Sequence, residues 1–164
     1  MDELKEIERT PEVIAAEIIA LQNQARRILL TSAIEVGRRL VEAKQKLIHG
    51  EWLQWLENSV GYSYRKAANL IGLYEAYGQA NLQQYANLSY SQAIILLGLP
   101  ESEREQFIQE LDIESMSKRQ LEKAVQERKA ALEKYEQAKA EEEKLKNSLK
   151  EQEQKITNLV LERD

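Results

Sequence analysis

Apolar and small residues recur at intervals of three and four along the first third of the chain. The positions with this spacing are Ile14, Ile18, Leu21, Ala25, Ile28, Ser32, Val36, Leu40, Ala43 and Leu47. They predict a helix with one apolar stripe. The segment Thr10-Pro11-Glu12 predicts the helix start, because it supplies a capping hydroxyl, a first-turn proline and an acid. His49-Gly50 ends the pattern, and the stretch is expected to form either one long helix or two helices separated at Thr31-Ser32.

A short helix, a turn and a second helix are predicted next. The apolar residues of EWLQWLENSV (residues 51–60) that fall on one side of a helix are Trp52, Leu53, Leu56 and Val60, with Trp55 adjacent. Both tryptophans are expected to pack in the core, where this side chain is usually found in a small helical domain. Gly61-Tyr62 is the predicted turn, Ser63 is the predicted N-cap of a helix over residues 64–77, and Gly78 is its predicted stop.

Further capping signals divide the second half of the chain. The residues that predict helix starts there are Asn81 (helix 82–87), Ser89 (helix 90–98), Pro100 (an acidic helix to about Leu111) and Ser117, which forms a Ser-x-x-Gln capping box with Gln120. A capping box satisfies two backbone donors at once. From Ser117 onward, helix-forming residues continue without a break, so one long final helix is expected.

The tail, residues 118–164, is polar with widely spaced apolar positions. These fall in two heptad registers, offset from each other: Leu121, Val125, Leu132 and Tyr135 in the first, then Leu145, Leu149, Ile156 and Leu159 in the second. One interpretation is a solvated single helix held by pairs such as Glu151–Lys155. The other is a coiled coil with a register shift. The pattern favours the coiled coil, because an isolated polar helix gains little from burial.

Composition predicts the fold class. Helix-forming residues dominate, and six glycines and two prolines interrupt them rarely, so an all-α fold is expected. Three segments are predicted: an N-terminal helical arm (1–48), a helix-turn-helix core (49–116) and a long C-terminal helix (117–164). The chain has no cysteine, which excludes disulfides and thiolate metal sites and fits a reducing cytoplasm. No apolar run reaches the length of a membrane span and no signal-peptide pattern opens the chain, so no membrane association is expected.

Charge is distributed unevenly along the chain. The net charge is −5, yet residues 26–78 carry eight bases and five acids. Arg65 and Lys66 lie in the predicted first helical turn, where the helix dipole favours anions rather than cations. An anionic partner would explain two positive charges at this position.

A helix, a glycine turn and a second helix at this spacing form a helix-turn-helix, whose second helix enters the major groove of DNA. The exposed residues at the start of that second helix are Ser63, Tyr64, Arg65, Lys66 and Asn69. Arginine can pair with guanine and asparagine with adenine, whereas lysine, serine and tyrosine suit phosphate oxygens. The expected core side of the same helix consists of Ala67, Leu70, Ile71 and Tyr74.

The stretch GYSYRKAANLIGL resembles the helix-turn-helix of ParB/KorB-type partition proteins, and the resemblance continues through LSYSQAIILLGLPESEREQF and SMSKRQLEKAV. It covers roughly residues 51–125. The matching positions are Gly61, Ser63, Ala68, Asn69, Leu70, Leu73, Leu88, Ser89, Ala93, Leu96, Leu97, Leu99, Pro100, Ser117, Arg119 and Leu121. The resemblance implies double-stranded DNA as the partner.

The chain departs from that family upstream of the helix-turn-helix. The family has a nucleotide-binding domain with a Gly-Glu-Arg-Arg box, whereas this chain offers only Gly37-Arg38-Arg39 on a helical pattern. Nucleotide binding is therefore not implied, and no cofactor is expected. Residues 36–78 also resemble uncharacterised small helical proteins of bacterial plasmids, phages and integrative elements, which implies a mobile-element origin.

Other candidate sites have simpler interpretations. His49 is the only histidine, so it is expected to be a polar residue at a helix end and no metal site is expected. Arg38 and Arg39 are expected to be solvated or paired with Glu35 and Glu42. No catalytic arrangement of acids with a nucleophile or phosphate loop is present in the sequence, so an enzyme is not expected.

The sequence therefore predicts a cytoplasmic, homodimeric, all-α DNA-binding protein that regulates transcription or maintains a plasmid, phage or integrative element. The alternative is a helical protein–protein adaptor, in which the N-terminal stripe and the C-terminal helix bind the helices of a protein partner.

Overall fold

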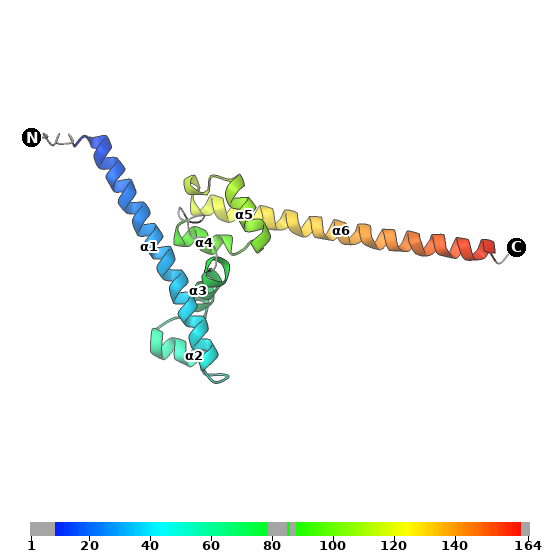
Figure 1. The fold of residues 1–164 in the computed structure, drawn as a ribbon, viewed down its shortest axis with the longest axis horizontal. Coiled ribbons are helices and arrows are strands. Elements are labelled where there is room, and N and C mark those ends of the chain that lie inside the picture. Colours follow the sequence, from blue (N-terminus) through cyan, green and yellow to red (C-terminus); the bar gives the residue numbers. More distant parts are fainter. Residues whose placement is uncertain (1–8, 79–84, 86–87, 162–164) are drawn as a thin grey trace, which may run out of the picture. The chain divides into compact units, whose positions relative to one another are not determined.

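The computed structural model describes residues 9–78, 85 and 88–161, and its regular elements in those ranges are all helical. In chain order they are α1 (Pro11–Lys46), α2 (Trp52–Trp55), the π-helical turn η1 (Leu56–Val60), α3 (Tyr64–Tyr77), α4 (Tyr90–Leu96), α5 (Glu101–Glu110), the 3-10 turn η2 (Ile113–Ser115) and α6 (Lys118–Leu161) (Figure 1). The described residues contain no strand. The all-α expectation and the long final helix are confirmed.

The chain divides into two compact units, Met1–Glu122 and Lys123–Asp164. The first unit contains α1 to α5, so the predicted arm and the predicted helix-turn-helix share one unit. The second unit is the rest of α6. The segment boundaries at residues 48 and 116 stay predictions.

Helix α1 is one helix of 36 residues, which settles the choice between one helix and two. The hydroxyl of Thr10 accepts a hydrogen bond from the Val13 N–H at 3.4 Å, and Pro11 occupies the first turn, as the sequence predicted. The helix runs through Thr31-Ser32 without a break and ends at Lys46.

Only the second half of α1 is packed, and it packs chiefly against α3. The buried residues of α1 are Leu30, Ala33, Ile34, Gly37 and Leu40. Of the predicted stripe only Leu40 is among them, so the stripe is not the core face of α1. The face of α1 that packs on α3 contains the small residues Ala33 and Gly37, which let the two helices approach closely.

Helix α3 has the predicted bounds and cap but a partly different core side. Its buried residues are Ala67, Leu70, Leu73 and Tyr77. The predicted core residues Ala67 and Leu70 are confirmed, whereas Ile71 and Tyr74 are only half-buried. Leu73 and Tyr77 have no exposed surface.

In the helical segment before α3, formed by α2 and η1, only one residue is buried. Leu56 is almost fully buried, but Leu53 and Val60 are exposed. The expectation that both tryptophans lie in the core is wrong, because Trp52 and Trp55 are only half-buried. Their rings stack on each other, with centroids 5.7 Å apart.

Helices α4 and α5 are joined to α3 by polar contacts in the core. The Tyr77 hydroxyl donates a hydrogen bond to the Ala93 carbonyl at 3.3 Å. Arg104 of α5 is buried, and it donates to the carbonyl oxygens of Leu96 and Leu99, at 3.2 Å each. Its guanidinium also lies 5.3 Å from the centre of the Tyr77 ring.

The later helix starts follow the capping signals. Ser89 and Gln92 form a capping box at α4, and Ser117 and Gln120 form the predicted one at α6. Pro100 precedes α5, whose bounds match the predicted acidic helix. The predicted helix 82–87 with its cap at Asn81 lies outside the described residues, apart from Tyr85.

Candidate nucleic-acid interface

The turn before α3 is fixed by one carbonyl oxygen. The N–H groups of Gly61 and Tyr62 both donate to the carbonyl of Leu56, and Gly61 has φ of 67°. A glycine adopts this left-handed conformation without steric cost. The chain therefore enters α3 in a defined direction.

The cap of α3 leaves two backbone donors available. The Ser63 hydroxyl accepts from the Lys66 N–H at 3.2 Å, and the Ser63 carbonyl accepts from the Ala67 N–H at 3.0 Å. The N–H groups of Tyr64 and Arg65 have no partner within the described ranges. Backbone donors at a helix start can bind an anion such as a phosphate.

The five candidate DNA contacts do not form one surface. Ser63, Tyr64, Arg65 and Lys66 are exposed, and Asn69 is half-buried. Arg65 and Asn69 are four residues apart and so lie on the same helix face. Lys66 is about 100° further around the helix than Arg65, which directs it toward α1 instead.

Lys66 has a partner in its own chain. Its ammonium nitrogen lies 3.9 Å from the centre of the Tyr62 ring. A cation over an aromatic face gains about 0.5–1 kcal/mol at an exposed site, and this offsets the cost of a positive charge at the helix start. The contact with Tyr62 therefore accounts for Lys66, and Arg65 is left as the cation in this helical turn whose position is not explained by a contact with a described residue.

Lys66 also borders a groove of about 320 Å³ between α1, α3 and α4. The residues that line this groove, called the α1–α3–α4 groove below, are Leu29, Ser32, Ala33, Val36, Tyr62, Lys66, Leu70 and Tyr90. Most of these side chains are apolar or aromatic. The groove therefore suits an apolar group rather than a phosphate.

Of the two cations in the first turn of α3, Arg65 is the one for which the described residues provide no partner. It is exposed, and it forms no ion pair or side-chain hydrogen bond with any described residue. Tyr64 beside it is 63% exposed. Together with Asn69, these residues offer a guanidinium, a phenol and an amide at the start of α3.

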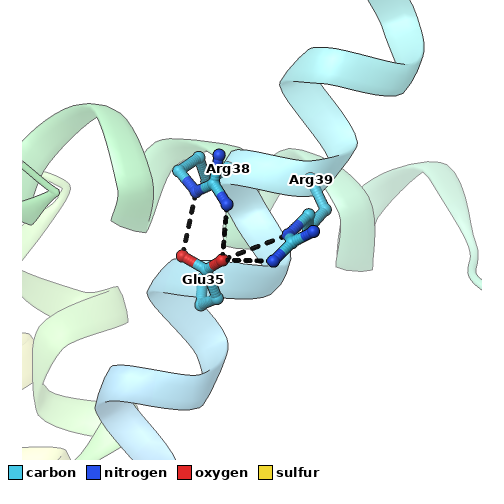
Figure 2. Close-up of polar contacts among 3 residues, drawn as sticks. All are labelled: Glu35, Arg38 and Arg39. Carbon is cyan, nitrogen blue, oxygen red and sulfur yellow. Dashed lines mark hydrogen bonds and ion pairs between the residues drawn. The ribbon is translucent and has the colours of Figure 1, made fainter.

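The second basic pair, on α1, is occupied by a single carboxylate. Figure 2 shows Glu35 between Arg38 and Arg39, with contacts of 2.7 Å and 2.9 Å to their guanidinium nitrogens. The hydrogen bonds from Arg38 and then Arg39 lower the pKa of Glu35 from 4.5 to about 2. The predicted pairing with Glu35 is confirmed. Glu42 is instead bound by Lys46, at 2.7 Å.

No candidate metal site is present among the described residues. They contain no group of three or more histidine, aspartate or glutamate side chains arranged to hold a metal ion. His49 is exposed in the turn after α1. Among the helices of the described ranges, none is long and apolar enough to cross a membrane.

Two features of the first unit were missed in the sequence, one at the start of α3 and one in α5. Tyr62 was expected in the turn, and of Tyr62 and Tyr64 one was expected to contact a phosphate and the other to pack, but the contact between the Tyr62 ring and the Lys66 ammonium was not expected. The spacing of Tyr62 and Lys66, four residues apart across a helix start, is a usable signal for such a contact. Arg104 was one base in an acidic segment, and no local pattern distinguishes a buried arginine from a solvated one.

Comparison with known proteins places the chain in a family without assigning it a function. No curated protein and no solved structure matches it significantly. Residues 9–128, which include α1 to α5 and the start of α6, match the family described as "Protein of unknown function (DUF3102)", and the chain belongs to this family.

Proposed function

We propose that this protein binds double-stranded DNA through the start of α3 and has no enzymatic activity. It acts in the cytoplasm as a regulator or maintenance factor of a plasmid, phage or integrative element. The observation that carries the proposal is the exposed Arg65, which no described residue neutralises, in the first turn of a helix that follows a glycine turn. The resemblance to the helix-turn-helix of partition proteins supports it.

Each residue at the helix start has a defined role in this proposal. Arg65 and Asn69 reach base edges, because they share a face and their side chains pair with guanine and adenine. The free N–H groups of Tyr64 and Arg65 and the hydroxyls of Ser63 and Tyr64 bind phosphate oxygens. Lys66 contributes charge but no base contact, because it lies over Tyr62.

A homodimer would bring two copies of α3 to two half-sites. The apolar positions of the second heptad register in α6 are exposed in the single chain: Leu145, Leu149, Ile156 and Leu159. We propose that they form a coiled coil with a second copy. Truncation after about Val125 is then expected to yield a monomer, and an unchanged dimer in sedimentation would move the interface to the N-terminal stripe.

One observation favours a second candidate function, a helical protein–protein adaptor. Large apolar side chains are exposed along the first half of α1, including Ile18 and Leu21. Exposed apolar stripes of this kind bind the helices of partners. On this alternative, the helix-turn-helix serves only to pack α1.

Selection of binding sites from random duplex DNA, followed by a salt titration, distinguishes the two functions. A DNA-binding protein recovers a motif, and its affinity falls steeply as salt rises because phosphate contacts release counterions. Apolar helix pairing lacks this dependence. Arg65→Ala and Asn69→Ala are expected to remove the sequence preference, whereas the matched variant Lys66→Ala weakens binding without changing the motif. Wild-type selectivity in both Arg65→Ala and Asn69→Ala would contradict the proposal.

A further inference from the structure

The α1–α3–α4 groove lies where three helices of the first unit meet. Helix α1 contacts both α3 and α4, and α3 contacts α4. The α1 side of the groove consists of Leu29, Ser32, Ala33 and Val36. These residues are three or four positions apart and therefore share one face of the helix. The groove is thus formed by helices that pack on one another within a single folded unit.

The size of the groove fits a small molecule. Its volume of about 320 Å³ is at the lower end of the roughly 300–1,000 Å³ that small-molecule sites occupy. Leu29 at the groove is 58% exposed, and Val36 and Tyr90 are half-buried, so the apolar lining is accessible. A protein interface uses about 20–30 residues on each side, whereas eight described residues line the groove. A helix of a protein partner is therefore a poorer fit.

Lys66 gives the groove one positive charge. Among the described residues that line it, Lys66 alone is charged. Its ammonium nitrogen lies 3.9 Å from the centre of the Tyr62 ring, and it forms no ion pair with a described residue. The contact with the ring holds the ammonium at the groove and leaves its N–H donors available. One ammonium balances one carboxylate, whereas a phosphate carries about two negative charges.

We propose that the α1–α3–α4 groove binds a small monocarboxylate. The apolar body of the ligand lies against Leu29, Val36 and Leu70, and its carboxylate pairs with the Lys66 ammonium. The carboxylate then lies beside the first turn of α3, where the helix dipole favours an anion. This site does not depend on DNA binding, because it uses the Lys66 side of α3 and not the face that carries Arg65.

The ion pair is tested with 2-naphthoate, which joins an apolar two-ring body to one carboxylate, and with 2-naphthamide as its uncharged control. In calorimetric titration of the full-length chain, naphthoate is expected to bind about three- to fivefold more tightly than the amide, the contribution of one exposed ion pair. Lys66→Met keeps the apolar stem and is expected to abolish this difference. Arg65→Met removes the neighbouring cation and is expected to preserve it. Absence of saturable naphthoate binding, or an equal loss in both variants, would overturn the proposal.

A second pair of variants tests the location of the apolar body. Ser32→Phe is expected to weaken naphthoate binding roughly tenfold, because its ring takes up volume that the ligand needs. Thr31→Phe makes the same change at an exposed position of α1 outside the lining and is expected to bind like wild type. Circular dichroism checks that both variants remain folded. Binding that is insensitive to Ser32→Phe would overturn the groove as the site.

Amide NMR of the wild-type chain separates the groove from the start of α3. Naphthoate is expected to shift the signals of Ser32, Lys66 and Leu70. Shifts confined to Tyr64 and Arg65 would place the anion on the backbone donors of the helix start and would overturn the proposal. Selection from random duplex DNA is a separate measurement, so failure of the carboxylate site and failure of DNA binding are distinguishable.

Discussion

Gly37 of α1 lies directly against the backbone of Leu70 in α3. A Cβ at this position would overlap the Leu70 carbonyl oxygen and would lie 2.9 Å from Tyr74 Cβ. The two helices that hold the candidate interface in place therefore cross where one of them has no side chain. The glycine of the Gly37-Arg38-Arg39 segment serves packing.

Gly37→Ala is expected to destabilise the first unit by about 1–3 kcal/mol, the usual cost of overpacking. This loss exceeds the gain of about 0.5–1 kcal/mol that alanine brings to a helix interior. Gly72→Ala is the matched control, because its added Cβ meets only the end of the Leu97 side chain, at 3.1 Å. Urea unfolding measures both. Equal stability of the two variants would show that α1 and α3 do not cross at Gly37.

Arg104 is expected to be the arginine whose loss costs most stability. Arg104→Met keeps the size of the side chain but removes its bonds to the carbonyls of Leu96 and Leu99. A hydrogen bond to a charged group contributes about 1.5–3 kcal/mol, and the contact with the Tyr77 ring is lost as well. The expected destabilisation is therefore about 2–4 kcal/mol in thermal or urea unfolding. Arg119→Met, at an exposed position of α6, should stay within about 0.5 kcal/mol of wild type.

Local signals in the sequence predicted the helices well. Thr10, Ser63 and the capping boxes at Ser89 and Ser117 each begin a helix as expected. The hydrogen bonds of such caps join residues only three positions apart, so a short stretch of sequence is enough to predict them. Local signals did not predict whether α1 is one helix or two. The part of α1 that follows Thr31-Ser32 packs against α3, and this contact joins residues far apart in the chain.

The choice of buried face could not be predicted from periodicity. The steps of three and four identified an apolar stripe on α1, but the structure buries a different face, centred on Gly37. An apolar stripe shows which face avoids water and does not show what covers it. The candidate residues do lie at the start of α3, but the contact between Lys66 and Tyr62 depends on side-chain geometry that the sequence pattern does not contain. The role of these residues in DNA binding stays a prediction.

Glu35 is expected to titrate at unusually low pH. Its pKa is lowered from 4.5 to about 2 in the folded chain by Arg38 and Arg39, so its stabilising effect is complete above pH 4.5 and is lost as the pH falls toward 2. The stability difference between wild type and Glu35→Gln should therefore shrink over this interval. Carbon NMR of the carboxyl group measures the midpoint directly. The double variant Arg38→Gln/Arg39→Gln should move that midpoint toward 4.5, and an unchanged midpoint would contradict the contacts in Figure 2.

Arg65 is expected to lower stability while it supports DNA binding. The helix dipole favours an acid at a helix start by about 0.3–1 kcal/mol, so Arg65→Glu should raise the midpoint of urea unfolding. The same variant should lose DNA binding, because its carboxylate would repel the phosphates that the guanidinium attracts. Lys66→Glu should gain less stability, since it also loses the contact with Tyr62. A variant Arg65→Glu that is more stable and still selects the wild-type DNA motif would remove Arg65 from the interface, and one that is less stable would show that the guanidinium has a structural partner.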